Sequence, residues 1–184
     1  MSEIKNRCAW VNMKNPLYIH YHDNECGMPE HWDEKLYELL ILESFQAGLS
    51  WECILNKREA FREAFDGFDI DKVCEYKEDK IDELMSDPKI IRNRRKIEAA
   101  VTNSRIFKEI QKEYGSFDTY LWGFANGKTI VEPYTLRTTS PLSDAISADL
   151  KKCGMKFVGS TVIYAYLQSI GMLSAHGCEC DLHR

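Results

Sequence analysis

The stretch from Leu36 to Trp51, LYELLILESFQAGLSW, constrains the fold more than any other part of the chain. Asp33 is suited to be the N-cap of a helix here, because its side chain can accept hydrogen bonds from the free amides of the first turn. Gly48 is suited to the left-handed position that ends a helix. The residues between them leave no continuous polar face: Leu36, Leu39, Leu40, Ile41, Leu42, Phe45 and Ala47 are apolar. A helix of roughly four turns that is apolar nearly all round is usually buried, so we expect a globule packed around it.

Glu43 is the exception within this stretch, because it lies on a helix face that is otherwise apolar. An unpaired carboxylate in such a place would cost several kcal/mol or take up a proton. Two interpretations are open. Glu43 is either a structural acid paired with a hydroxyl or an amide, or a recognition or acid/base carboxylate in a cleft.

Composition limits the class of protein. No Pro-, Gly- or Ser-rich linker divides the 184 residues, so we expect one domain spanning residues 1–184. The net charge of −5 argues against a uniformly basic nucleic-acid coat but leaves a local basic patch open. Neither a signal peptide nor a run of roughly 20 apolar residues is present, so we expect a soluble, cytoplasmic monomer without a membrane partner. Seven scattered cysteines fit reduced thiols or metal ligands better than disulfides.

Cysteine and histidine gather near both ends of the chain. Cys8 and His22 lie in an N-terminal segment with few hydrophobic periodicities, which we expect to be irregular, and His176 and Cys180 lie in SAHGCECDLHR. About 150 residues separate the two groups, so neither is a zinc finger of the usual local spacing. Together the four side chains would supply two thiolates and two imidazoles, a tetrahedral set suited to one structural Zn2+. The alternative is that they are ordinary surface or core residues.

One basic patch interrupts this acidic sequence. It joins a short helix around Ile81–Met85, which Asp87 and Pro88 end, to a longer helix capped by Asn93 that ends at Gly115. Its residues are Lys89, Arg92, Arg94, Arg95 and Lys96. Two helices with cations at their turn resemble a helix-hairpin-helix module that binds the DNA backbone, and the alternative is a solvated charged turn.

The other elements expected are also helices. Ser50 is a suitable N-cap for a helix that ends around Asp66 and Gly67, and further helices are expected at 117–125, 141–152 and 161–170, the second capped by Ser140. Residues 130–139 are expected to be extended or loop, and no convincing alternation of apolar and polar residues occurs. The predicted fold class is therefore all-α. Leu49, at the turn between the first two helices, is either a small core plug or a wedge between stacked DNA bases.

Several motifs together resemble the 3-methyladenine DNA glycosylase I family. In chain order they are CAWV, NPLYIHYHDNECG, LESFQAGLSW, IIRNRRKI, LWGFANGK, KFVGSTVIYAYLQSIGM and AHGCEC. They run from Cys8 to Cys180, almost the whole chain, and YHDNE and QAGLSW are particularly specific. The resemblance implies a helix-hairpin-helix DNA glycosylase fold whose ends are joined by one zinc ion, held by Cys8, His22, His176 and Cys180.

The same resemblance assigns Glu43 to a base pocket as the catalytic and recognition residue, surrounded by Trp10, Tyr18, Tyr21 and Trp51. The chain departs from the family pattern at one position, where it has Cys26 and the family usually has Trp. We therefore expect one thinner pocket wall and weaker affinity for the base.

The implied reaction is the hydrolytic removal of flipped 3-methyladenine from double-stranded alkylated DNA. Methylation at N3 makes the base cationic, so aromatic faces and a buried carboxylate would select it over neutral adenine. The leaving base then needs little acid catalysis. Three alternatives remain open: an alkylpurine glycosylase of broader range, a noncatalytic zinc-stapled helical module that binds DNA, and a thiol-dependent enzyme.

Overall fold

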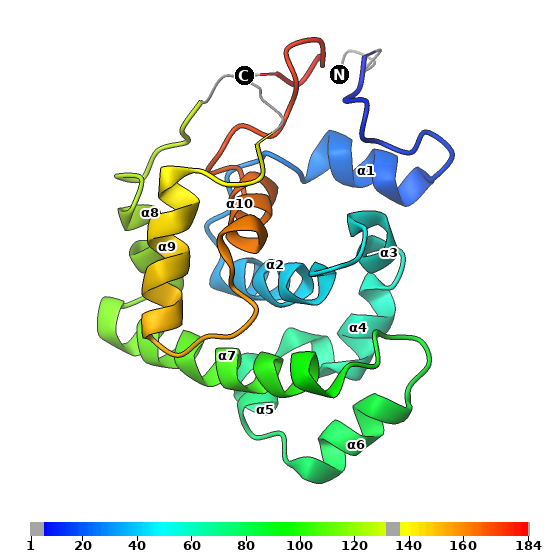
Figure 1. Ribbon diagram of the computed structural model, residues 1–184, viewed down its shortest axis with the longest axis vertical. Coiled ribbons are helices and arrows are strands. Elements are labelled where there is room, and N and C mark those ends of the chain that lie inside the picture. The colour runs from blue at the N-terminus through cyan, green and yellow to red at the C-terminus, as the bar shows by residue number, and fades with distance from the viewer. Residues whose placement is uncertain (1–5, 132–136, 184) are drawn as a thin grey trace.

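The computed structural model describes residues 6–131 and 137–183. Their regular elements are helices (Figure 1). In chain order they are α1 Pro16–Asn24, α2 Asp33–Gln46, α3 Trp51–Leu55, α4 Arg58–Ala64, the 3-10 turn η1 Asp66–Phe68, α5 Ile70–Cys74, α6 Glu78–Ser86, α7 Arg94–Tyr114, α8 Phe117–Gly123, α9 Pro141–Lys152 and α10 Ser160–Ser169. An isolated bridge between Ile130 and Leu173 is the one extended pairing in the described ranges. The all-α prediction is confirmed, while residues 132–136 of the expected extended segment lie outside the described residues.

Helix α2 occupies the centre of the fold and packs against α3, α7, α8 and α10 (Figure 1). Leu36, Leu40 and Ile41 are completely buried within it. The helix ends at Gln46, and Gly48 adopts a φ of 82° directly after it. The buried central helix and its predicted end are therefore confirmed.

Asp33 does not cap α2, so this prediction is wrong. Trp32 occupies the N-cap position and provides no side-chain hydrogen bond. The Asp33 carboxylate instead accepts hydrogen bonds from the backbone amides of Phe117 and Asp118, each at 2.8 Å. It thus satisfies free amides at the start of α8, a helix whose proximity only the tertiary fold establishes.

The helix expected from Ser50 to about Gly67 is divided into pieces. Ser50 caps α3 as predicted, accepting a hydrogen bond from the amide of Cys53. The chain then leaves helical geometry at Lys57, and Gly67 has a φ of 71° inside η1. The break allows α3 to contact α1 while α4 continues toward η1.

The N-terminal segment is more regular than expected, because it contains α1. Asn15 caps this helix by accepting from the amide of Leu17, and Pro16 occupies its first position. Proline is favoured there because that position needs no amide donor. The residues before α1 lie beside the C-terminal segment (Figure 1), and the backbone amide of Asn6 donates to Asp181 at 3.1 Å.

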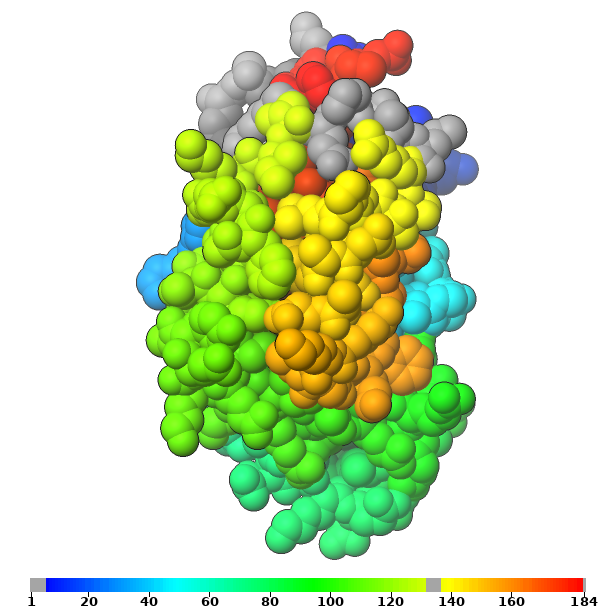
Figure 2. All heavy atoms as spheres, turned by 60° about the vertical axis from the view of Figure 1, so that its left-hand side comes forward, coloured from blue at the N-terminus to red at the C-terminus, as the bar shows by residue number. Residues whose placement is uncertain are grey.

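Helices α7 and α9 begin as predicted. Asn93 accepts from the amide of Lys96, and Ser140 forms a capping box with Ser143. Figure 2 shows α9 on the surface beside α7, with the turn after α9 against α7. Within residues 6–131 and 137–183, no helix combines the length and apolar character that a bilayer crossing requires.

Candidate active site

Glu43 lies in the second half of α2 with only 2% of its surface exposed. Among the described residues, its Oε2 atom has no hydrogen-bond partner. Burial raises the pKa of its carboxyl to about 8, because the charged form loses its hydration. In the free protein this group is therefore largely protonated at neutral pH, and a cationic ligand would favour its ionised form.

Glu43 lines a cavity of about 330 Å³, which we call the base cavity. All four aromatic residues expected around Glu43 line it too, namely Trp10, Tyr18, Tyr21 and Trp51. The remaining lining residues are Cys26, Gln46, Arg137, Thr138, Ala165, Gln168, Ser169 and Ala175. The structure thus brings together side chains from α1, α2, α3 and α10 and from segments near both ends of the chain.

The aromatic side chains of the base cavity form a continuous series. Ring centroids lie 5.5 Å apart between Trp10 and Tyr18, 6.5 Å between Tyr18 and Tyr21, and 5.3 Å between Tyr21 and Trp51. Burial raises the pKa of Tyr18 to about 12 and that of Tyr21 well above its ordinary value, so both hydroxyls are neutral. Aromatic faces beside one carboxyl group suit a flat, positively charged ligand.

Local structure explains how these side chains converge. Tyr18 and Tyr21 are three residues apart in α1 and therefore share one face of that helix. Ser50 starts α3 at Trp51, only a short turn after α2 ends. Lys96, which is 7% exposed, donates from Nζ to the carbonyl oxygens of Phe45 and Ala47 at 2.8 and 2.6 Å. This lysine holds the end of α2 in place.

Several residues of the base cavity were not identified from the sequence. Gln46 follows Glu43 by one turn of α2, so helical spacing alone could have indicated it. Ala165 and Gln168 lie on α10, and no sequence signal places that helix beside Glu43. Cys26 also lines the cavity, as the motif comparison implied for the position where the family usually has Trp.

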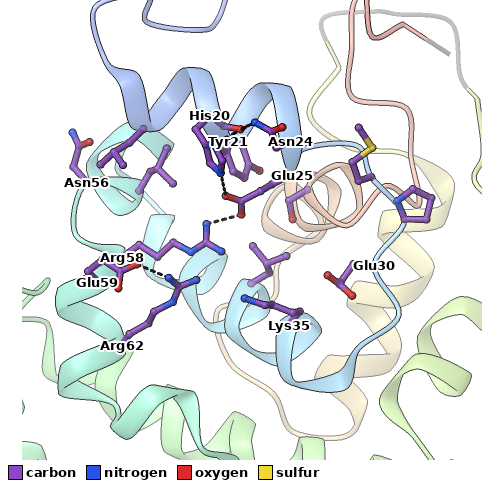
Figure 3. A pocket seen from close by; sticks show the side chains of 16 residues that line it. His20, Tyr21, Asn24, Glu25, Glu30, Lys35, Asn56, Arg58, Glu59 and Arg62 are labelled. Atoms are coloured by element: carbon purple, nitrogen blue, oxygen red, sulfur yellow. Dashed lines mark hydrogen bonds and ion pairs between the residues drawn. The ribbon is translucent and has the colours of Figure 1, made fainter. Parts of the chain in front are cut away.

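A second cavity, of about 490 Å³, shares Tyr21 and Ser169 with the base cavity. Figure 3 shows that its lining is strongly charged, with Arg58 directed toward Glu25 and Arg62 toward Glu59. The Arg58–Glu25 contact is 2.6 Å. Both arginines thus already pair with acids of the same lining, and no unpartnered buried side-chain atom of the described residues lines the cavity. It is therefore a weaker candidate for a ligand site than the base cavity.

The four predicted metal ligands form a single buried cluster. Their donor atoms lie within 4.8 Å of one another. The Nδ1 atom of His176 lies 3.6 Å from Cys8 Sγ, 3.7 Å from Cys180 Sγ and 3.2 Å from His22 Nε2. Ligands around a tetrahedral zinc ion are separated by roughly 3.3 to 3.8 Å, given its bond lengths to sulfur and nitrogen. The cluster joins the N- and C-terminal regions and fits a structural zinc site.

Both histidines of this cluster are oriented by a second partner. His22 donates from Nδ1 to Asp23 at 2.8 Å, and Arg7 in turn contacts that carboxylate at 2.6 Å. Hydrogen bonds from Arg7 lower the pKa of Asp23, so it stays charged. His176 donates from Nε2 to the carbonyl of Cys26 at 3.0 Å. Such outer partners fix which nitrogen faces a metal, as in known zinc sites.

The structure places the five residues of the predicted basic patch differently from one another. Arg94 is paired with Glu78 and Asp82 of α6, and Lys96 is buried beneath the end of α2. Lys89 lies 3.7 Å from Glu63, while Arg92 and Arg95 are exposed. The sequence of the patch contains no acidic residue, but the fold places Glu78 and Asp82 of α6 beside Arg94. Leu49 is 41% exposed, so it is not a core plug.

Comparison with known proteins identifies the family. The family described as methyladenine glycosylase matches residues 10–184. The chain belongs to the 3-methyladenine DNA glycosylase I family. The resemblance seen in the motifs is therefore confirmed.

Two comparisons from this family cover nearly all of the chain. The DNA-3-methyladenine glycosylase 1 of Escherichia coli (strain K12) is 42% identical over 180 residues, which are 95% of this chain and 96% of the relative. The crystal structure of a 3-methyladenine DNA glycosylase I superposes with a TM-score of 0.93 at 39% identity, covering 97% of this chain and 100% of the other.

A third comparison bears on the base cavity. The Staphylococcus aureus 3-methyladenine DNA glycosylase I, whose structure concerns 3-methyladenine recognition, superposes with a TM-score of 0.91 at 38% identity over 97% of each chain. The described helices thus have the all-helical fold of the 3-methyladenine DNA glycosylase I family.

Proposed function

We propose that this protein removes 3-methyladenine from alkylated double-stranded DNA by hydrolysing its N-glycosyl bond, with Glu43 recognising the flipped base. One observation carries the assignment of the site: Glu43 lines a cavity of aromatic side chains and has a buried carboxyl oxygen with no partner in the part of the chain that the structure describes. Membership of the 3-methyladenine DNA glycosylase I family supplies the reaction.

The residues of the base cavity suit the chemistry of this substrate. A purine methylated at N3 carries a positive charge within the nucleotide. It would stack on Tyr18 and Tyr21, while Glu43 accepts a hydrogen bond from its exocyclic amine and loses its own proton to solvent. When the bond to C1′ breaks, its electrons neutralise the base, which leaves without protonation. Water then supplies a hydroxyl to the sugar and releases its other proton to solvent. Selection of the cation thus matters more than acid catalysis.

Incubation of the protein with methylated DNA, followed by chromatography of the released bases, tests this function. Release of 3-methyladenine alone supports it. Release of several methylated purines would favour an alkylpurine glycosylase of broader range, and binding without release a noncatalytic module. Excision that persists after treatment with a thiol-alkylating reagent would exclude a thiol-dependent enzyme.

We propose that the cluster of Cys8, His22, His176 and Cys180 holds one structural Zn2+. Bound zinc would tie the two ends of the chain together and needs no open coordination position. Structural zinc in small sites supplies roughly 10 kcal/mol or more of folding energy. Cys8→Ser and Cys180→Ser should therefore lower metal content and thermal stability together, while Cys178→Ser, an exposed neighbour, changes neither. Elemental analysis that finds no zinc in freshly purified protein would disprove the proposal.

The proposed DNA surface surrounds the start of α7, where Lys89, Arg92, Arg94, Arg95 and Lys96 lie. We propose that the exposed Arg92 and Arg95, together with Lys89, contact the phosphate backbone of the DNA. Arg94 and Lys96 would support that surface through α6 and α2. A hollow beside Arg95 is also lined by Lys156 and Phe157, from the turn before α10, which starts without a side-chain cap. Leu49 would serve as a wedge that fills the space left by the flipped base.

Charge reversal tests this surface. Arg92→Glu with Arg95→Glu should weaken DNA binding at low salt and flatten its salt dependence, because fewer counterions are released. Lys112→Glu is a matched control, since Lys112 is exposed at the far end of the same helix. Binding of free 3-methyladenine should remain unchanged. An unaltered salt slope would mean that the patch is only a solvated surface.

We also propose that residues 1–184 form one monomeric, cytoplasmic domain. The main hydrophobic core of the described residues draws on helices from α1 to α10, which supports a single unit. None of the seven cysteines forms a disulfide within the described residues, as expected in a reducing compartment. Size-exclusion chromatography with light scattering would test the monomer, and a dimer mass would contradict it.

A further inference from the structure

Two turns from opposite halves of the sequence meet on α7. The first, residues 47–50, joins α2 to α3 and carries the exposed Leu49; we call it the wedge turn. The second, residues 153–159, joins α9 to α10, and we call it the α9–α10 turn. Side chains of α7 donate to backbone carbonyl oxygens in both turns, so this helix sets how the two turns lie relative to each other.

Lys96 of α7 holds the wedge turn. Its ammonium group donates to the carbonyl oxygens of Phe45 and Ala47, at the point where α2 ends. The last carbonyl groups of a helix have no partner within it, and a cation beside them also complements the helix dipole. Within the turn, the amide of Leu49 donates to the carbonyl oxygen of Gln46 at 2.6 Å. The path of the wedge turn therefore depends on a side chain 49 positions away from Ala47.

Asn103 of α7 holds the α9–α10 turn. This side chain is 1% exposed and forms two hydrogen bonds with the backbone of Lys156. Its Nδ2 donates to the carbonyl oxygen at 2.9 Å, and its Oδ1 accepts from the amide at 2.8 Å. Asn103 follows Lys96 by about two turns of the helix, so both side chains project from the same face of α7.

Phe157, the next residue of the α9–α10 turn, has a φ of 54°, a left-handed conformation that a bulky residue rarely adopts. Such a conformation persists only where its surroundings fix it, and it often marks a functional position. Asn103 fixes the residue before Phe157, and Ser147 Oγ donates to the carbonyl oxygen of Val158 after it at 2.7 Å. The Phe157 ring lies over Lys96, with the ring centroid 5.9 Å from Nζ. A cation attracts an aromatic face, so one lysine connects the two turns.

We propose that Asn103 is a positioning residue: by fixing the left-handed Phe157 against Lys96, it holds the wedge turn in register with the α9–α10 turn. This inference rests on the proposed function, in which Leu49 enters the duplex and the hollow lined by Lys156 and Phe157 belongs to the DNA surface. Flipping a base costs unstacking and unpairing energy, and a small misplacement of a group that assists it slows the reaction greatly. Asn103 is not among the described residues that line the base cavity or this hollow.

Asn103→Leu tests the proposal, because leucine has a similar size but can form neither hydrogen bond. The single-turnover rate of excision from duplex DNA should fall about tenfold or more at saturating protein. Affinity for the same DNA should change less than about twofold, since phosphate contacts dominate it. Affinity for free 3-methyladenine, measured by calorimetry, should stay unchanged. A variant with a lower melting temperature but a normal excision rate per folded molecule would overturn the proposal.

Fluorescence of 2-aminopurine gives a second measurement, which a role confined to stability would not change. The probe is placed beside an abasic-site analogue in a duplex, where stacking quenches it. Wild-type protein should increase the fluorescence because the wedge turn unstacks the probe, and Asn103→Leu should increase it less at saturation. An equal increase with both proteins would contradict the proposed register between the two turns.

Phe157→Leu is a second variant, which serves if Asn103→Leu does not fold. It keeps an apolar side chain at a half-buried position but removes the aromatic face over Lys96. It should also slow excision and reduce the fluorescence increase, and wild-type values in both measurements would show that the proposed connection is wrong.

Arg105→Met is the matched control on the same helix. Arg105 Nε donates to the carbonyl oxygen of Cys74, at the end of α5, at 2.8 Å. This variant thus loses the same kind of contact away from both turns, and it should lose stability but keep its excision rate per folded molecule. If it slows excision as much as Asn103→Leu does, Asn103 has no special role. If wild-type protein releases no 3-methyladenine from DNA, the proposed function itself fails.

Discussion

Two buried glutamates on α2 have opposite surroundings. Glu38, 6% exposed, accepts hydrogen bonds from Arg58 at 2.7 Å and from Arg62 at 2.7 Å. Burial disfavours its charge, but these hydrogen bonds outweigh burial and lower the pKa of Glu38 below its ordinary value. Glu43, five residues later, has an oxygen without a partner among the described residues, and its pKa is raised to about 8.

The difference separates two uses of a buried acid. Glu38 keeps its charge in the folded protein because α4 supplies two arginines, so its function is complete without a ligand. Glu43 Oε2 has no partner among the described residues, so this buried carboxyl is destabilising in the free protein, and we propose that it gains a partner when the base enters the cavity. A buried carboxyl indicates a binding site when its environment leaves it unpaired, and burial alone does not.

Removing the charge of Glu38 should have the largest effect on stability. Glu38→Gln leaves the buried Arg58 with only Glu25 as an acidic partner, and we expect a loss of about 3 kcal/mol in the free energy of unfolding. Urea unfolding measures it. Glu59→Gln is the control, because Glu59 pairs with Arg62 at the exposed surface and should change little. Excision per folded molecule should stay normal, and a stable Glu38→Gln protein would contradict this account.

Removing the charge of Glu43 should instead affect recognition. Glu43→Gln keeps the shape but loses a charge-assisted hydrogen bond to the base, which is worth about 1.5 to 3 kcal/mol, or roughly ten- to a hundredfold in excision at low substrate. Thermal stability should be unchanged or higher, because a buried ionisable group is removed. Melting temperature and excision rate, measured side by side, check this. A destabilised variant with normal excision would make Glu43 a second structural acid.

The two acids should also give opposite dependences of stability on pH. The pKa of Glu43 is higher in the folded protein than in the unfolded chain. Its contribution to the free energy of unfolding is therefore fully present below about pH 4.5 and is lost as pH rises to about 8. The folded pKa of Glu38 is lowered, so its contribution is lost as pH falls. Between pH 5.5 and 7.5, the free energy of unfolding of wild-type protein should therefore fall by about 2 kcal/mol relative to that of Glu43→Gln. Parallel curves for the two proteins would contradict the raised pKa.

Local sequence signals predicted the elements that depend on neighbouring residues. Asn93 and Ser140 cap their helices as expected, and the apolar run of α2 correctly predicted its burial. Glu43 stood out because it interrupts that run. The four metal ligands could be proposed because thiolate and imidazole chemistry is specific even when the ligands are distant in sequence.

Features that depend on packing between distant elements could not be predicted. Nothing around Glu38 indicates that Arg58 and Arg62 of α4 lie beside it, so only one of the two buried acids was noticed. The sequence around Arg94 contains no acid and so predicts an unpaired cation, but in the fold Glu78 and Asp82 of α6 pair with it. Asp33 has the side chain of an N-cap, but the amides that it satisfies belong to α8.

The buried cluster of Cys8, His22, His176 and Cys180 has a consequence for the order of folding. Cys8 and Cys180 are 172 positions apart, so joining them closes a loop that includes almost the whole chain. Such closure is entropically costly and slow compared with helix formation. We therefore expect the cluster to form last, after α2 and α10 have packed. Trp10 and Ala175 lie on the same two segments as the ligands, so the base cavity is completed at this final step. A folding chain should thus have a packed core before it can bind a base.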